Sequence, residues 1–266
     1  MTTTLFLFAH QDDELGVMSE IEETRARGER AVCAYLTNGA WAGVGEARRN
    51  AESTVVLAAL GVGSSDIAFI GSTQAIPDGR LVEHLERAMA ALDSLIGEIG
   101  DVGRIVMHAW EGGHHDHDAT HLVGLAAAVR HDLLARCRQF PLYRGPTGRI
   151  FSTFAKPLAA NGVVERRRIP WASRLGYWLL LRHYRSQWKV MARLAPLLAW
   201  DYLADGCQKL QAVSLVRAGL PPNNGVMLYE IWRLYSYVEF RRYATPFIVG
   251  HLAPVGRANN QVQPPA

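Results

Sequence analysis

The chain has 266 residues and a mass of 29.4 kDa, and 49% of its residues are hydrophobic and 20% charged. This composition is ordinary for a soluble globular protein and excludes a disordered, collagen-like or coiled-coil chain. The net charge of +3 is unevenly placed: residues 1–129 carry eight Arg against nineteen acidic residues (−11), and residues 130–266 carry twenty Lys and Arg against six (+14). Either the second half faces an anionic partner, or it faces the acidic first half within one fold.

The first half of the chain predicts alternating strands and helices. Apolar runs of strand length occur at residues 5–9, 31–36, 67–70 and 105–110, and helical patterns at residues 14–27, 46–60, 81–99 and 121–134. Apolar strands that alternate with helices are typical of a parallel sheet covered on both faces. We therefore expect an α/β fold with a mostly parallel sheet and helices on both of its faces.

The second half has a different character. Residues 166–202 are rich in Arg, Trp, Tyr and Leu and predict mostly helix, with breaks at Pro170 and Pro196, whereas residues 226–248 are aromatic-rich and ambiguous between helix and strand. We expect a catalytic core at residues 1–140 and a helical, aromatic- and Arg-rich extension at residues 141–266. The extension would complete the fold and the substrate cleft, so that both parts form one integrated domain.

The cysteines and the apolar segments indicate the compartment. Cys33, Cys137 and Cys207 include no close pair, which excludes a disulfide framework and a cysteine zinc site. The start, MTTTLFLFAH, lacks the basic segment of a signal peptide, and no apolar run approaches the ~20 residues of a membrane span. These features fit a protein of the reducing cytoplasm.

Two segments that follow predicted strands are dense in His and acidic residues. Residues 9–14 (AHQDDE) follow the first strand, and residues 111–118 (EGGHHDHD) follow the fourth. Since the carboxyl ends of parallel strands open on one edge of the sheet, the two segments are expected to meet. His10 and Asp13 from one turn, with His117 as a third ligand, would leave positions open for water and substrate, as in a catalytic metal site.

Neighbouring residues fit catalytic roles around such an ion. Asp12 lies beside a ligand and is a candidate base, and His114, three residues before His117, could face the substrate oxygen. Asp116 could hold a histidine ring nitrogen and fix its tautomer. Taken singly, the acidic turn would be an ordinary helix N-terminus and the His-rich run an adventitious metal site, but their placement at two strand ends of one sheet favours catalysis.

The same residues resemble the motifs of a known family. Ala9–Glu14 is similar to the AHPDDE signature of the LmbE-like, or PIG-L, metal-dependent de-N-acetylases, and His114–His117 is similar to their HPDH-type motif. Lesser similarities occur at Thr37-Asn38-Gly39, at Arg49 with Glu52, at Ser186-Gln187 and at Tyr229-Glu230. The resemblance is strong over about residues 4–130 and thin beyond them.

The resemblance implies a Rossmann-like fold and hydrolysis of an N-acetyl group from an amino sugar, as in the N-acetylglucosaminyl de-N-acetylases. It implies one divalent metal ion, most often zinc with iron as the alternative, bound by His10, Asp13 and His117. It makes Asp12 the general base and His114 the group that stabilises the oxyanion or protonates the amine, with Asp116 orienting His114. Gln11 and His115 depart from the family pattern, because both replace Pro and His115 adds a competing imidazole.

Three further residues are candidates for substrate binding. Arg49 could hold a phosphate or hydroxyl group of the substrate, Asp78 a sugar hydroxyl, and Glu111 also could reach the site. Each has an ordinary alternative: a helix ion pair for Arg49, turn chemistry for Asp78 and a structural carboxylate for Glu111.

These observations predict a cytoplasmic, metal-dependent amidohydrolase that deacetylates an amino sugar, nucleotide- or lipid-linked, in surface-polysaccharide biosynthesis. A same-class alternative is a deacetylase of a small glycoside in thiol biosynthesis. Alternatives of another class are a non-catalytic anion- or membrane-binding module, and a metal phosphoesterase with a second ion at His115, Asp118 and His121.

The partner we expect is a small-molecule amino sugar and no nucleic acid. The basic second half allows peripheral membrane contact, and the sequence leaves the oligomeric state open. Residues 166–193 are predicted to bind the diphosphate of a linked substrate, with Arg166, Arg167 and Arg168 taking part.

Overall fold

The computed structural model describes residues 1–144 and 153–252. Its strands are β1 (Thr3–Phe8), β2 (Arg30–Tyr35), β3 (Ile67–Ala68), β4 (Val102–His108), β5 (Arg138–Phe140), β6 (Tyr143–Arg144), β7 (Thr153–Phe154), β8 (Val164–Arg168) and β9 (Cys207–Ala212). Its helices are α1 (Met18–Ala26), α2 (Glu46–Ala59), α3 (Ile70–Thr73), α4 (Leu85–Ile99), α5 (His115–Arg130), α6 (Trp171–Leu180), α7 (Trp188–Ala199), α8 (Leu215–Ala218), α9 (Leu228–Ile231) and α10 (Tyr237–His251).

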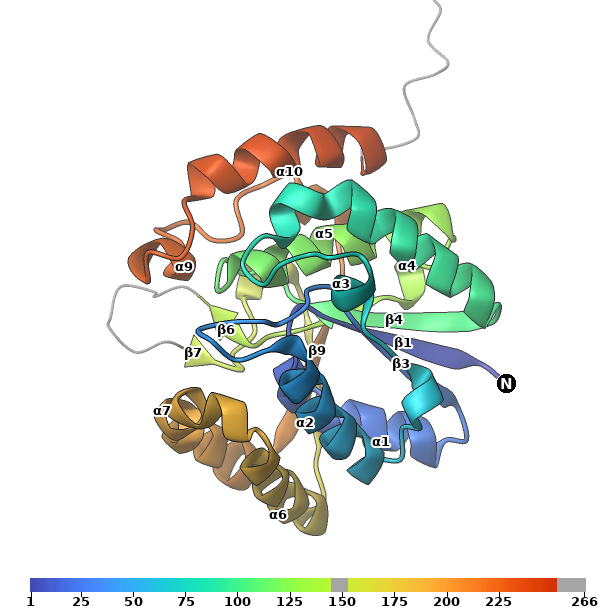
Figure 1. Cartoon of the computed structure of the whole chain (residues 1–266), viewed down its shortest axis with the longest axis vertical. Coiled ribbons are helices and arrows are strands. Elements are labelled where there is room, and N and C mark those ends of the chain that lie inside the picture. Colours follow the sequence, from blue (N-terminus) through green and yellow to red (C-terminus); the bar gives the residue numbers. More distant parts are fainter. Residues whose placement is uncertain (145–152, 253–266) are drawn as a thin grey trace, which may run out of the picture.

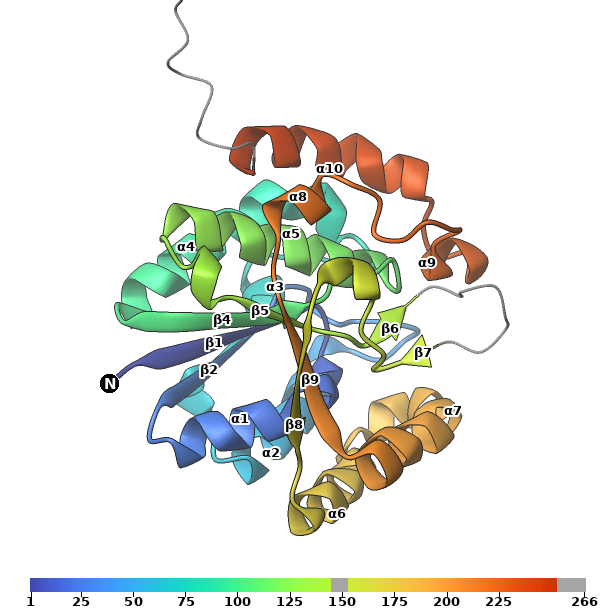
Figure 2. The ribbon, with the colours of Figure 1, turned by 180° about the vertical axis from the view of Figure 1, so that it is seen from behind.

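A seven-stranded sheet with the order β3-β2-β1-β4-β5-β9-β8 forms the centre of the molecule (Figures 1 and 2). The first five strands are parallel, whereas β9 runs antiparallel to β5 and β8 runs antiparallel to β9. This confirms the predicted α/β fold with a mostly parallel, Rossmann-like sheet. Strands β8 and β9 come from the second half of the chain and extend the sheet that the first half builds. The strand order reverses between β1 and β4, which is where open sheets of this type bind ligands.

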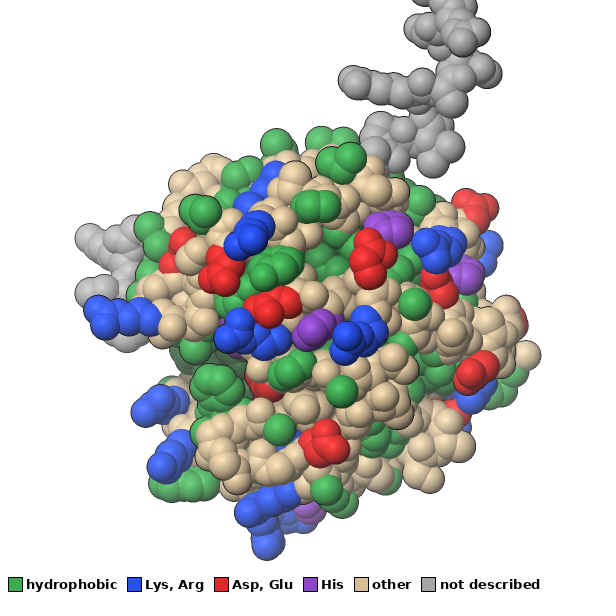
Figure 3. All heavy atoms as spheres, turned by 45° about the horizontal axis from the view of Figure 1, so that its top comes forward, with side chains coloured by type: hydrophobic (Ala, Val, Ile, Leu, Met, Phe, Trp, Pro, Cys, Tyr) green, Lys and Arg blue, Asp and Glu red, His purple; other side chains and the backbone are tan. Residues whose placement is uncertain are grey.

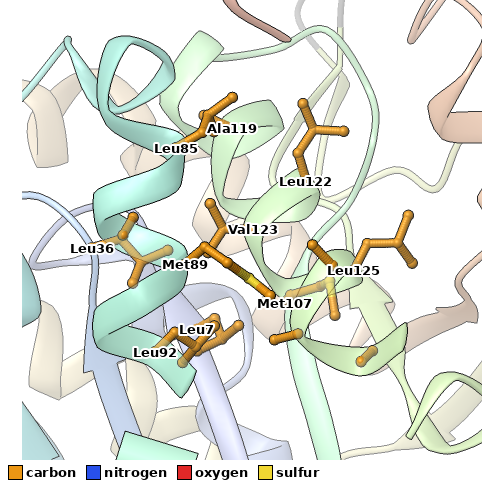
Figure 4. Close-up of a cluster of buried hydrophobic side chains, with 14 of the residues drawn as sticks. Leu7, Leu36, Leu85, Met89, Leu92, Met107, Ala119, Leu122, Val123 and Leu125 are labelled. Carbon is orange, nitrogen blue, oxygen red and sulfur yellow. The ribbon is translucent and has the colours of Figure 1, made fainter. Parts of the chain in front are cut away.

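Helices cover both faces of the sheet (Figure 1). Strand β1 alternates between the faces: Leu5 and Leu7 pack into a core with α4, α5 and α10, and Phe6 and Phe8 into a core with α1, α2, α6 and α7. Figure 4 shows the first core, where side chains of α4 and α5 meet Leu7 and Met107 of the sheet. The predicted apolar stripe of α4 is buried there, namely Leu85, Met89, Leu92 and Ile96.

The fourth large helix begins earlier than the sequence predicts. We expected a helix at residues 121–134, but α5 runs from His115 to Arg130. The Nδ1 atom of His114 accepts a hydrogen bond from the backbone N–H of Asp116 and so caps the helix. Asp116 and Asp118 in the first turn offset the helix dipole. A stretch that looks like a polar loop is therefore the first turn of a buried helix.

The prediction of helix from residue 166 onward is wrong at its start. Residues Val164–Arg168 form β8, an edge strand of the sheet. Charged side chains on an edge strand oppose pairing with another chain, which accounts for an Arg-rich strand. The break expected at Pro170 is present directly before α6, whereas α7 passes through Pro196 and continues as π-helical turns at Trp200–Asp205. The ambiguous residues 226–248 contain α9 and most of α10.

Some arginines of the basic second half form ion pairs with acidic residues of the same chain. The guanidinium of Arg167 lies 2.9 Å from Glu20 and also pairs with Glu23, which joins β8 to α1. Arg166 pairs with Asp205 at 2.6 Å. These arginines are therefore occupied by carboxylates, and neither lines the large cavity described below. Among the described residues, no helix has both the length and the apolar character needed to cross a membrane.

Candidate active site

The polar residues that follow β1 and those that follow β4 meet at the carboxyl ends of these strands. They line one cavity of about 930 Å³, within the range of small-molecule sites. Its polar floor is formed by His10, Asp12, Asp13, Asp78, His114 and His117. Its walls include Trp41, Tyr143, Trp232 and an apolar side of α7. Figure 3 shows the surface hollowed at the left of the molecule, with hydrophobic side chains beside the hollow.

The turn after β1 is held in an unusual conformation. Asp12 has a φ of 112°, which is rare for a residue with a side chain and is found where surrounding contacts impose it. The backbone N–H of His10 donates to Asp13 Oδ2 at 2.7 Å, and that of Asp12 donates to Glu14 at 3.0 Å. The turn therefore presents His10, Asp12 and Asp13 together to the cavity.

Gln11, which stands where the resembled family has Pro, also fixes this turn. Its Nε2 atom donates to Asn50 Oδ1 at 2.6 Å and thereby joins the turn to α2. Gly39 packs against the Gln11 amide so closely that a Cβ at residue 39 would lie 1.8 Å from Oε1. Gly39 also has a φ of +66°, so both the space and the backbone require glycine there.

Asp13 lies against both His10 and His117, the other two predicted ligands. Asp13 Oδ1 lies 3.2 Å from His117 Nε2, Asp13 Oδ2 lies 3.5 Å from His10 Nδ1, and the two imidazole centres are 5.4 Å apart. Among the described residues, four donor groups have all their ligand atoms within 4.8 Å of one another. Two of them contain His117: His10 with His114 and His117, and Asp13 with His108 and His117. Buried imidazoles with a carboxylate are the donors that zinc and similar ions prefer, so the residues fit a divalent metal.

His108 is the residue of this cluster that sequence reasoning missed. It is the last residue of β4 and is fully buried, and its Nε2 atom lies 3.0 Å from Asp13 Oδ2. Its ring stacks on His117 with centres 3.9 Å apart, and its Nδ1 atom has no hydrogen-bond partner. The available signal was a histidine inside an otherwise apolar strand, directly before the carboxyl end where the site was expected.

Asp116 contacts a different histidine from the one that the family resemblance implies. Its Oδ2 atom lies 3.0 Å from Nε2 of His10, whereas only its backbone N–H reaches His114. The same carboxylate accepts the backbone N–H groups of Gly79 at 2.6 Å and Leu81 at 3.0 Å. Asp116 therefore orients His10 and anchors the turn at residues 77–81. Because the Asp116 carboxylate contacts Nε2 of His10, the other ring nitrogen of His10, Nδ1, is directed toward Asp13.

The three predicted substrate-binding residues have different surroundings. The buried Arg49 guanidinium donates to the carbonyls of Gly39 and Gln11 and lies 3.3 Å from Asp12 and 3.1 Å from Asp78. Asp78 lines the cavity, and its other oxygen lies 3.4 Å from His10 Nε2. Arg49 and Asp78 are thus part of the polar floor, with Nη1 and Nη2 of Arg49 already engaged.

Glu111, by contrast, is not brought to the cavity. Its side chain is buried outside the cavity lining. There Oε1 accepts the backbone N–H groups of Leu142 and Tyr143, both at 2.8 Å. Tyr143 lines the cavity and stacks on His117, with ring centres 5.5 Å apart. Glu111 therefore acts on the site through the position of Tyr143.

Burial shifts the pKa values of His114, His117 and Asp12. It lowers the pKa of His117 to about 4 and that of His114 well below the usual value, so both rings are neutral and able to act as ligands or acceptors. Burial raises the pKa of Asp12 to about 8, against the opposing charge of Arg49.

The second cation site suggested for a phosphoesterase is not assembled. His115 Nε2 lies 3.0 Å from the carbonyl of Gly79, and Asp118 accepts the backbone N–H groups of residues 111 and 112. His121 Nδ1 lies 2.9 Å from the carbonyl of His108. Among the residues that the structure describes, no donor group joins these three side chains.

The comparisons with known proteins identify the first half of the chain. Residues 5–128 match the model of the PIG-L family, described as GlcNAc-PI de-N-acetylase. Residues 5–128 are therefore a PIG-L domain. This confirms the LmbE-like resemblance, and the PIG-L domain contains both motif segments. No curated protein matches the chain in sequence.

Solved structures share the fold over 70–83% of the chain. The A40926 pseudoaglycone deacetylase Dbv21 is 19% identical with a TM-score of 0.59, covering 80% of this chain and 97% of that chain. The conserved protein TT1542 from Thermus thermophilus is 22% identical with a TM-score of 0.55, covering 83% and 96%. A zinc inhibited form of the teicoplanin deacetylase Orf2 is 17% identical with a TM-score of 0.54, covering 70% and 85%.

Proposed function

We propose that this protein is a metal-dependent deacetylase that hydrolyses the N-acetyl group of an amino sugar. The observation that carries the proposal is the convergence of His10, Asp12 and Asp13 with His114 and His117 at the floor of one cavity, at the switch point of a PIG-L domain. The family description and the structural relatives named as deacetylases support it.

His10, Asp13 and His117 would hold one divalent ion. When bound, the ion supplies a Lewis acid for the acetamide carbonyl and lowers the pKa of water. Zinc suits the two imidazoles and the carboxylate, and iron is the alternative. His108 contacts Asp13 from behind and would orient that ligand.

Asp12 and His114 would perform the proton transfers and hold the developing charge. Asp12 is placed to take a proton from the attacking water, whose oxygen bonds to the acetamide carbon. His114 lies across the floor, with its ring 4.8 Å from that of His10, and would stabilise the tetrahedral oxyanion or protonate the leaving amine. The C–N bond then breaks, which gives acetate and the free amino sugar.

The cavity walls favour a substrate larger than a free monosaccharide. Val190, Leu194 and Leu197 of α7 form an apolar side, and Arg80 and Arg193 are cations of the lining. An acetamido sugar linked to a nucleotide or a lipid would fill this space, as in cytoplasmic steps of surface-polysaccharide biosynthesis. Arg forks match phosphate oxygens, so the two arginines would hold the linking diphosphate.

Acetate release tests the proposed function. The metal-loaded protein is incubated with free acetamido sugars and with their nucleotide and lipid conjugates, and acetate is measured. Release from at least one conjugate, lost in Asp12→Asn, is the expected result. Metal binding without acetate release from any acetamido sugar would contradict it.

A further inference from the structure

The side of α6 that faces solvent is apolar, and two exposed tryptophans lie on and just after α7. On α6, Trp171, Leu175 and Leu179 follow one another at four-residue intervals and are 61%, 53% and 56% exposed. On and just after α7, Trp188 and Trp200 are 62% and 65% exposed. Folding normally buries such large side chains, and a contiguous set left outside marks an interaction surface. We call these five residues the α6–α7 face.

The cations beside the α6–α7 face are not neutralised by the protein. Between Glu165 and Asp201 the sequence has no acidic residue. Within residues 1–144 and 153–252, no carboxylate lies within 4.0 Å of Arg182, Arg185 or Lys189. Arg166 and Arg167 on the neighbouring β8 are, in contrast, both paired with acids. Lys189 instead lies 5.8 Å from the ring of Trp188, so that charge and aromatic surface are adjacent.

We propose that the α6–α7 face docks on the surface of a membrane that contains anionic lipids. Trp and Leu side chains enter the boundary between headgroups and acyl chains, and Lys and Arg beside them bind the anionic headgroups. A purely apolar protein partner would leave the unpaired cations without counter-charges. The combination of exposed Trp and Leu with cations, and with no acidic residue in the sequence of α6 or α7, favours a lipid surface.

The position of the face relative to the cavity suits this partner. Helix α7 belongs to both, since Val190, Leu194 and Leu197 line the cavity while Trp188 is on the exposed face. Figures 1 and 2 show α6 and α7 together at one end of the molecule, on the opposite side of the sheet from α10. Several Lys and Arg side chains project there in Figure 3. Docking would bring the mouth of the cavity close to the lipid surface.

Co-sedimentation of the full chain with lipid vesicles tests the proposal. Vesicles of phosphatidylcholine alone are compared with vesicles that also contain phosphatidylglycerol, without any substrate. We expect binding to the anionic vesicles, weakened by salt, together with a blue shift of the tryptophan emission. The variants Leu175→Ser/Leu179→Ser and Arg185→Glu/Lys189→Glu should each weaken binding at least ~10-fold, since every cation and inserted side chain contributes.

Matched substitutions on another helix control for general surface effects. Val238→Ser with Arg242→Glu changes an exposed apolar residue and an exposed cation of α10 and should leave vesicle binding unchanged. No binding to anionic vesicles overturns the proposal, as does a lipid-free dimer that Leu175→Ser/Leu179→Ser abolishes. None of the changed residues lines the cavity, so acetate release from a water-soluble conjugate reports on the proposed function separately.

Discussion

Arg49 Nη2 lies 3.3 Å from Oδ1 of Asp12, and Nη1 of the same guanidinium lies 3.1 Å from Asp78. One buried side chain of α2 thus joins the turn after β1 to the turn at residues 77–79. It also accounts for how Asp12 keeps its unusual φ, because Arg49 donates to the carbonyl of Gln11 directly before it. We propose that Arg49, a predicted substrate ligand, acts as a positioning residue for the floor of the site.

Arg49→Lys should separate these two roles. Lysine keeps the charge but cannot reproduce the fork that reaches two carbonyls and two carboxylates. We expect kcat to fall by ~10²-fold through misplacement of Asp12, with KM changed much less and bound metal retained. Steady-state kinetics with metal analysis measures this. A raised KM at constant kcat would instead make Arg49 a substrate ligand.

Asp12→Asn tests the base. Asparagine has nearly the same size but cannot accept the proton, so turnover should fall by ~10²–10⁴-fold while metal content stays the same. Elemental analysis and acetate release on the same preparation give both quantities. Loss of metal together with activity would show that Asp12 is a ligand.

Metal content tests the ligand set. One cluster predicts about one divalent ion per chain, and His10→Ala or His117→Ala should empty it. His115→Ala should retain the ion, because Nε2 of His115 is already engaged by the carbonyl of Gly79. His108→Asn should also retain the ion, because His108 is not one of the three proposed ligands. Loss of the ion would instead assign it to the donor group of Asp13, His108 and His117. Nearly two ions per chain in the native protein would refute the mononuclear site.

The sequence was sufficient wherever one local pattern determines the structure. The apolar stripe of α4 predicted its buried side, and the polar ends of two apolar strands predicted which segments meet, because the geometry of a parallel sheet leaves few alternatives. The sequence was insufficient where contacts between residues far apart in the chain determine the structure. The pairing of β8 with β9 joins residues 164–168 to residues 207–211, and the carboxylate of Asp116 reaches His10 across 106 positions. His108 was missed because a single histidine in a strand has no periodicity to mark it.

Glu111 predicts a pH dependence of stability. Burial raises its pKa from 4.5 to about 8, and its Oε2 atom has no hydrogen-bond partner. A carboxyl group with a raised pKa in the folded state stabilises the fold fully below pH 4.5 and loses that contribution as the pH rises to about 8.

Glu111→Gln should remove this loss, because the amide oxygen can still accept the N–H groups of Leu142 and Tyr143 while no charge forms. The free energy of unfolding of the variant minus that of the native protein should increase by several kcal/mol between about pH 5 and pH 8. Denaturant titrations across this range measure the difference. Glu98→Gln, which removes an exposed carboxylate, is the control, and a difference independent of pH for Glu111→Gln would contradict the assignment.

The last prediction concerns which arginines recognise a diphosphate-linked substrate. From the sequence we expected Arg166, Arg167 and Arg168 to do so, but they lie on the edge strand β8, where the first two are paired with acids. Arg80, which pairs with Glu83 at 2.6 Å, and Arg193 line the cavity instead. Arg80→Gln/Arg193→Gln should therefore reduce kcat/KM for a diphosphate-linked acetamido sugar by ~10-fold or more and leave the free sugar nearly unaffected, since each charge-assisted contact contributes about 1.5–3 kcal/mol.

Arg166→Gln/Arg167→Gln is the matched control for charge. It should leave the preference for the linked sugar unchanged and lower the stability instead, because Glu20 would lose a partner between α1 and β8. The advantage of the linked sugar in the native protein should also shrink with added salt, since part of the attraction is long-range. Equal kcat/KM for linked and free sugar at low salt would remove the diphosphate from the proposed substrate, and the apolar side of α7 would then bind the aglycone without help from charge.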